Sequence, residues 1–213
     1  MAYHHATKPD VLHAHDPALP TVSVCYVIIN PAAGTYTPAD MQQALERHFG
    51  ASQRPYEVYE TTGAERLPDV VQAAVQRGVG MVVAAGGDGT VSAGASGLVG
   101  TGVPLGILPV GTANVLAQEL GIPTDLDAAC GLLVQEHTTI GIDAMAVDNQ
   151  HFFLQIGIGL DAMMIRDTSR QHKRWFGRLA YLWTLLARLF GYQPRRFTIV
   201  VDGKRHRPRA AQV

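Results

Sequence analysis

A glycine-rich turn with a single carboxylate is the strongest chemical feature of this sequence. Residues 84–90 read Ala-Ala-Gly-Gly-Asp-Gly-Thr and follow an apolar run that is typical of a buried strand. Glycines let backbone N–H groups approach a ligand closely, and the N-terminus of a following helix adds partial positive charge, so such a turn suits phosphate. The predicted phosphate-binding residues are Gly86, Gly87, Gly89 and Thr90.

The carboxylate of Asp88 is out of place beside phosphate unless it performs a chemical task. It would either bind a bridging divalent cation or accept the proton of an attacking hydroxyl. The sequence does not separate these two roles, so Asp88 is predicted both as catalytic residue and as metal ligand.

Two further polar turns follow apolar strands. Asn30-Pro31-Ala32-Ala33-Gly34 ends the first strand, and residues 108–114, Leu-Pro-Val-Gly-Thr-Ala-Asn, end a later one. An isolated Gly-Gly-Asp-Gly is equally compatible with a plain strand-to-helix turn. Because parallel strands end along one edge of a sheet, three such turns favour a shared site. The candidate residues in these turns are Asn30, Pro31, Gly34, Gly111, Thr112 and Asn114.

The order and separation of these three turns resemble the diacylglycerol kinase catalytic domain family, which includes bacterial lipid kinases and the sphingosine and ceramide kinases. The resemblance runs from about Val22 to the end of the chain and includes the turn at 157–162, Gly-Ile-Gly-Leu-Asp-Ala. It implies an ATP-dependent kinase that phosphorylates a lipid hydroxyl, such as that of diacylglycerol, with ATP and Mg²⁺ as cofactors.

The resemblance also assigns roles to individual residues. It implies that Asn30 lies on the nucleotide side of the site and that Thr112 and Asn114 contact phosphate or ribose. In the family, a threonine after the second strand contacts the nucleotide, which makes Thr61 and Thr62 candidates here. Capping of the next helix by either hydroxyl is the alternative.

The chain departs from the family in two respects. Ser92-Ala93 stands where relatives usually carry Asn-Glu, so one acidic group expected beside the site is missing. Relatives also extend further, so we expect either a fragment of a longer protein or a second chain that supplies the rest. The antiparallel sheet of this chain is then expected to have unpaired edges. The competing functions are an NAD kinase, which has a similar glycine turn, and a non-catalytic nucleotide-binding remnant.

The predicted fold class is α/β, with an open parallel sheet followed by an incomplete antiparallel β domain. Alternating strands and helices before residue 137 predict the parallel sheet, whereas consecutive strands after it predict the antiparallel part. Strands are expected at 22–29, 56–60, 81–84, 104–108, 138–148, 151–158 and 197–202, and helices at 38–49, 67–77, 90–99, 112–120 and 126–136. The predicted domains are a disordered leader (1–20), a nucleotide-binding kinase domain (21–137) and a partial lipid-substrate domain (138–213).

Composition narrows the setting and the partners. The net charge of −1 gives no bulk attraction to nucleic acid, but Arg and Lys are dense from Arg166 to Arg209, which favours anionic lipid. The apolar segment Trp175 to Phe190 is too short and too charged to span a bilayer, which leaves a buried helix or a helix at the membrane interface. Cys25 and Cys130 are predicted to be buried free thiols. We expect a cytoplasmic protein with peripheral contact at the inner membrane face and a homodimer as a candidate assembly.

Overall fold

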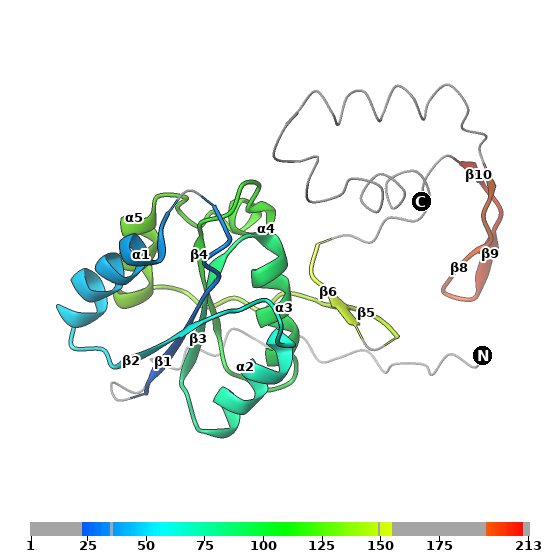
Figure 1. Cartoon of the computed structure of the whole chain (residues 1–213). Helices are drawn as coiled ribbons and strands as arrows, with labels where there is room; N and C mark the ends of the chain where they lie inside the picture. The colour runs from blue at the N-terminus through cyan, green and yellow to red at the C-terminus, as the bar shows by residue number, and fades with distance from the viewer. Residues whose placement is uncertain (1–22, 35, 149, 155–194, 211–213) are drawn as a thin grey trace. The chain divides into compact units, whose positions relative to one another are not determined.

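The computed structural model describes residues 23–34, 36–148, 150–154 and 195–210. The chain divides into two compact units, residues 1–154 and 155–213, and each is described by itself (Figure 1). The predicted leader, the turn at 157–162 and the apolar segment 175–190 lie outside the described residues. The domain boundary at residue 138 stays a prediction.

A four-stranded parallel sheet forms the centre of the first unit. Its strands are β1 (Cys25–Ile29), β2 (Tyr56–Glu60), β3 (Met81–Gly86) and β4 (Leu105–Pro109), in the order β2-β1-β3-β4. Each neighbouring pair is parallel. The apolar runs predicted as strands therefore pair as expected, and the α/β fold class is confirmed.

Helices cover both faces of this sheet (Figure 1). One face carries α1 (Pro38–Leu45), the π-helical turn η1 (Glu46–Gly50) and α5 (Leu126–Val134). The other carries α2 (Leu67–Gln76), α3 (Asp88–Leu98) and α4 (Val115–Glu119). Alternate residues of β1 supply the two cores: Val27 packs with α1 and α5, whereas Ile28 packs with α2. This alternation is the period of two that a strand imposes on its side chains.

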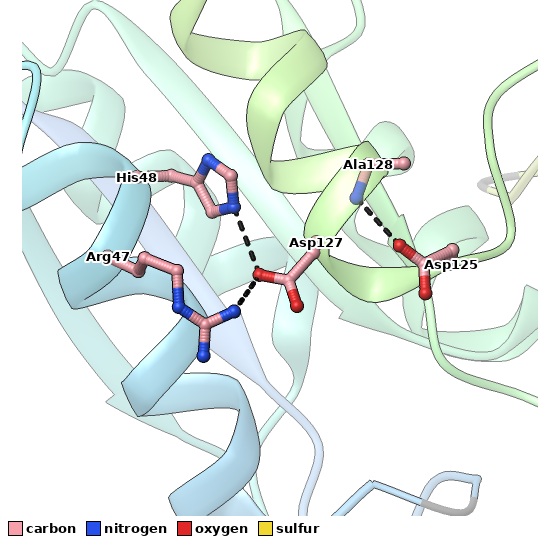
Figure 2. A network of polar contacts seen from close by, with 5 residues as sticks. All are labelled: Arg47, His48, Asp125, Asp127 and Ala128. Carbon is pink, nitrogen blue, oxygen red and sulfur yellow. Dashed lines mark hydrogen bonds and ion pairs between the residues drawn. The ribbon is translucent and has the colours of Figure 1, made fainter.

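The first face is held by polar contacts as well as by its core (Figure 2). Asp127, in the first turn of α5, accepts hydrogen bonds from Arg47 and, at 3.0 Å, from Nε2 of His48, both in η1. Asp125 caps the same helix, because its Oδ1 accepts from the N–H of Ala128 at 2.9 Å. One carboxylate thus joins two elements that are about 80 residues apart in the chain.

The small side chains of α3 allow it to lie close to α2. A Cβ atom added at Gly97 would stand 2.7 Å from the carbonyl oxygen of Pro68 and from the Cβ of Val71. Any side chain there would push the two helices apart. The small residues of α3 thus allow it to pack closely on α2.

Several predicted elements are shorter in the structure, among them the following two. The helix expected at 112–120 begins only at Val115, because Asn114 adopts the left-handed conformation. The strand expected at 138–148 is reduced to β5 (Met145–Val147), paired with β6 (Gln150–Phe152). Residues 138–144 lack a ladder partner among the described residues, and β propensity alone does not make a strand.

The second unit is described at residues 195–210, where it is antiparallel as expected. β7 (Arg195–Arg196) pairs with β10 (Arg209–Ala210), and β8 (Ile199–Val201) pairs with β9 (Lys204–His206). Asp202 and Gly203 both have positive φ, which is the Asp-Gly hairpin turn that the sequence carries. Among the helices of the described residues, none combines the length and apolar character needed to cross a membrane.

Candidate active site

The three polar turns predicted from the sequence meet at the carboxyl ends of β1, β3 and β4. The first and third turns touch at Gly34, where an added Cβ would overlap the carbonyl oxygen of Val110. Gly34 also has φ of 73°, so it meets two requirements that only glycine satisfies together. The second and third turns touch at Gly87 and Gly111, whose backbones lie against each other.

Asn30 links the first turn to the second. Its Nδ2 donates to Oγ1 of Thr90 at 2.9 Å, and its Oδ1 accepts from the N–H of Ala32 at 3.0 Å. Thr90 is buried and Asn30 is half-buried, so this bond is partly shielded from water. Pro31 and Thr112, predicted in the flanking turns, are exposed at the same edge of the sheet.

The glycine turn leads directly into α3. Gly87 is the N-cap of this helix and makes no side-chain capping bond, and Asp88 is its first residue. The N–H groups of Thr90 and Val91 donate to the carbonyl oxygen of Gly87. The amides of Asp88 and Gly89 come before Thr90 in the first turn, where a helix offers no carbonyl to its N–H groups four residues earlier. These two amides are the donors that the helix N-terminus presents to a ligand.

Asp88 also makes a contact that the sequence did not reveal. Its Oδ1 accepts a hydrogen bond of 2.6 Å from the backbone N–H of Val115, the first residue of α4. The carboxylate therefore caps a helix that is not its own. A backbone N–H belongs to nearly every residue, so no residue type in the sequence marks this donor.

Asn114 directly precedes Val115, the donor of this contact. Its side chain is 8% exposed, accepts from the N–H of Gly111 and donates to the carbonyl oxygens of Pro109 and Gly111. Both amide hydrogens are thus used within the turn.

Thr61 and Thr62 follow β2 at the same edge of the sheet. The N–H of Thr61 extends the ladder to the carbonyl oxygen of Ile29, at 2.8 Å. Thr62 donates its hydroxyl and its N–H to the carboxylate of Glu65, at 2.6 and 2.9 Å, and these bonds hold the pKa of Glu65 at about 2. The N-cap of α2 is Arg66, which has no side-chain capping bond, so the helix-cap alternative for the two threonines is wrong.

The side chains at the three turns limit the kind of metal site that they can form. Among the described residues there is no group of three or more His, Cys, Asp or Glu side chains that could hold a metal ion. Asp88 is the carboxylate at the three turns, and Ser92 and Ala93 add no acid on the following turn of α3. Mg²⁺ is commonly held by one or two carboxylates together with substrate phosphates, so a single aspartate fits only a cation bound jointly with a nucleotide.

The fold and these three turns define an α/β protein with a glycine-turn site at the carboxyl edge of a parallel sheet. The family model described as the diacylglycerol kinase catalytic domain matches residues 24–147. The chain belongs to this family.

Individual relatives agree with that assignment. The chain is 34% identical over 158 residues to a diacylglycerol kinase of Mycobacterium tuberculosis, covering 70% of this chain and 50% of the relative. It is 32% identical over 168 residues to an uncharacterized protein of Synechocystis, covering 74% of this chain and 38% of the relative. The chain thus spans half or less of the length of these curated relatives.

The fold also matches a solved structure. A crystal structure of a diacylglycerol kinase from Bacillus anthracis superposes with a TM-score of 0.70 at 24% identity, covering 89% of this chain and 62% of that one. At this identity the likeness shows the fold alone.

Proposed function

We propose that the protein is the nucleotide-binding part of an ATP-dependent lipid kinase, which transfers the γ-phosphoryl group of ATP to a lipid hydroxyl such as that of diacylglycerol. The observation that carries the proposal is that all three family turns touch at one edge of the sheet. Asn30 is hydrogen-bonded to Thr90, and the backbone of Gly87 lies against that of Gly111. Membership of the family supports the lipid substrate over NAD.

The residues present fit a nucleotide phosphate group. The amides of Asp88 and Gly89 lie in the first turn of α3, and a Cβ at Gly89 would meet nothing within 4 Å, so the space beside Gly89 is open. Phosphate binds readily at such helix ends. Thr61 and Thr112 supply further hydroxyls at the same edge, which is consistent with contacts to the nucleotide, whereas the hydroxyl proton of Thr62 is donated to Glu65.

Asp88 is the residue to which we assign the chemistry. Phosphoryl transfer depends mainly on positioning and on neutralising charge. Mg²⁺, held by Asp88 and the phosphates, would neutralise charge on the transferred group. In the alternative role, Asp88 would accept the proton of the lipid hydroxyl as its oxygen bonds to the γ-phosphorus, while the bond from that phosphorus to the bridging oxygen breaks and ADP leaves.

A non-catalytic nucleotide-binding role is the second candidate function. It is favoured by Ser92 and Ala93, which leave α3 without the acid that relatives usually carry one turn after Asp88. Under either function we propose a cytoplasmic protein that binds a lipid and contacts the inner membrane face peripherally. We propose no nucleic-acid partner, and a homodimer is the assembly to test.

The deciding experiment measures ATP consumption by the protein with Mg²⁺, with and without diacylglycerol in mixed micelles, beside Asp88→Asn. The kinase proposal expects turnover that diacylglycerol stimulates and that Asp88→Asn loses. ATP binding without turnover would support the non-catalytic candidate. Phosphorylation of NAD in place of lipid would assign the other kinase class.

A further inference from the structure

Asn114 is folded into its own turn. It is buried, and its side chain makes three hydrogen bonds: Oδ1 with the N–H of Gly111 at 2.9 Å, and Nδ2 with the carbonyl oxygens of Pro109 at 2.9 Å and Gly111 at 2.8 Å. An asparagine side chain has only two N–H donors, and both are used here. The side chain is therefore not arranged to donate to a phosphate or a ribose.

The backbone of Asn114 has an unusual conformation with a directional consequence. Its φ and ψ are 50° and 45°, in the left-handed region, which asparagine adopts more readily than most side chains. The ψ angle of one residue sets the direction of the next residue's N–H. At Val115 that N–H points to Asp88 and donates to Oδ1 at 2.6 Å.

The contact leaves Asp88 oriented but still able to react. The carboxylate has two oxygens, and Oδ1 is engaged by the Val115 amide. Among the described residues no hydrogen bond to Oδ2 is found, so this second oxygen can bind a cation or accept a hydroxyl proton. A fixed carboxylate needs no reorientation at the moment of reaction.

We propose that Asn114 is a positioning residue for Asp88: its three side-chain bonds hold the turn so that the Val115 N–H orients the Asp88 carboxylate. The proposal rests on the proposed function only in giving Asp88 a reaction to perform. It replaces the direct contact with nucleotide that the sequence predicts for Asn114.

The test follows the Val115 amide by ¹⁵N–¹H spectroscopy and hydrogen exchange, and needs no turnover. Asp88→Ala is expected to shift the Val115 signal and to speed its exchange roughly tenfold, since the acceptor is removed. Asn114→Ala is expected to do the same through the turn. Thr112→Ala, an exposed change in the same turn, should leave Val115 as in the wild type, and the amides of β1 report that the fold is intact.

A second variant keeps the test decisive if Asn114→Ala does not fold. Asn114→Gly permits the left-handed conformation without strain but removes all three side-chain bonds. Faster exchange at Val115 in Asn114→Gly supports the proposal, whereas wild-type protection there overturns it.

Kinetics provide an independent readout if the protein is an active kinase. A positioning role predicts that Asn114→Gly lowers kcat roughly tenfold while the KM for ATP changes little. A raised KM for ATP with unchanged kcat would instead make Asn114 a nucleotide ligand. Absence of turnover in the wild type would count against the proposed function, and the Val115 amide would still decide the role of Asn114.

Discussion

The backbones of Gly87 and Gly111 lie against each other, so that a Cβ added at Gly111 would overlap the Cα of Gly87 and stand 2.7 Å from Oδ1 of Asn114. Glycine at 111 therefore does more than permit a turn. It brings the turn after β4, which leads to the Val115 N–H, into contact with the turn that starts α3 and carries Asp88.

Replacement of Gly111 by alanine should destabilise the protein. The nearest atom that the new methyl group meets is the backbone Cα of Gly87, which cannot move aside as a flexible side chain would, and the next is the hydrogen-bonded Oδ1 of Asn114. We expect a loss of about 1–3 kcal/mol in the free energy of unfolding, measured by urea denaturation. Gly89→Ala is the control, because a Cβ there meets nothing within 4 Å, and it should unfold no earlier than the wild type. Equal midpoints for Gly111→Ala and the wild type would contradict the contact.

Thr90→Val tests the bond between the first and second turns. Valine keeps the shape of threonine but removes the acceptor of the Asn30 amide, at a site where Thr90 is 7% exposed. We expect a loss of about 1 kcal/mol in unfolding free energy, and Thr90→Ser, which keeps the hydroxyl, should recover part of it. If valine and serine behave alike, the hydroxyl does not carry the contact.

The sequence predicted the parallel sheet well because its strands end at residues with clear physical signals. Asn30-Pro31 cannot continue β1, and the glycines after Ala85 end β3. The meeting of three turns then follows from parallel topology alone. The length of the strand at 138–148 did not follow, since a strand needs a partner and a sequence does not name it.

Some contacts could not be predicted from the sequence, because they use a backbone group or a side chain that could equally have bonded elsewhere. The Val115 N–H on Asp88 leaves no residue-type signal, and neither does the loop that Glu65 closes on Thr62. The left-handed Asn114 shortened α4 because asparagine tolerates that conformation but does not require it. The Val115 contact and the left-handed Asn114 nevertheless decide how Asp88 is held.

Asp127 should make stability depend on acid. Hydrogen bonds from His48 and Arg47 hold the pKa of its carboxyl below the ordinary 3.8, so the folded state favours the ionised form. The contribution is present above pH 3.8 and is lost as the pH falls through the lower folded-state pKa. We expect Asp127→Asn to have a lower urea midpoint than the wild type near neutral pH, with the gap closing in strong acid.

A matched variant separates this effect from the general loss of one negative charge. Asp143 is exposed, and Asp143→Asn should leave the urea midpoint nearly unchanged at both pH values. Because Asp127 is half-exposed, its gap should also shrink in high salt. A gap that persists unchanged in acid would show that the Asp127→Asn substitution disturbs packing instead.

The thiol of Cys130 should be inert in the folded protein. Its side chain is fully buried against the first face of the sheet, and burial raises its pKa to about 12, with nearby Asp127 adding to the shift. Burial likewise raises the pKa of Cys25. The thiolate is the reactive form, so both cysteines are protected by protonation as well as by access. Ellman's reagent at mildly alkaline pH should therefore titrate neither thiol in the native protein and both in urea.

The raised pKa of Cys130 also predicts how the stability of the fold changes in alkaline solution. An unfolded cysteine loses its proton near pH 9, whereas folded Cys130 keeps it to about 12, so the unfolded state binds fewer protons between these values. Stability should fall as the pH rises through that window. Cys130→Ala removes this titration and should flatten the alkaline fall, although the lost sulfur leaves a small cavity that lowers stability at every pH. An equally steep alkaline fall in Cys130→Ala would mean that groups other than this thiol govern it.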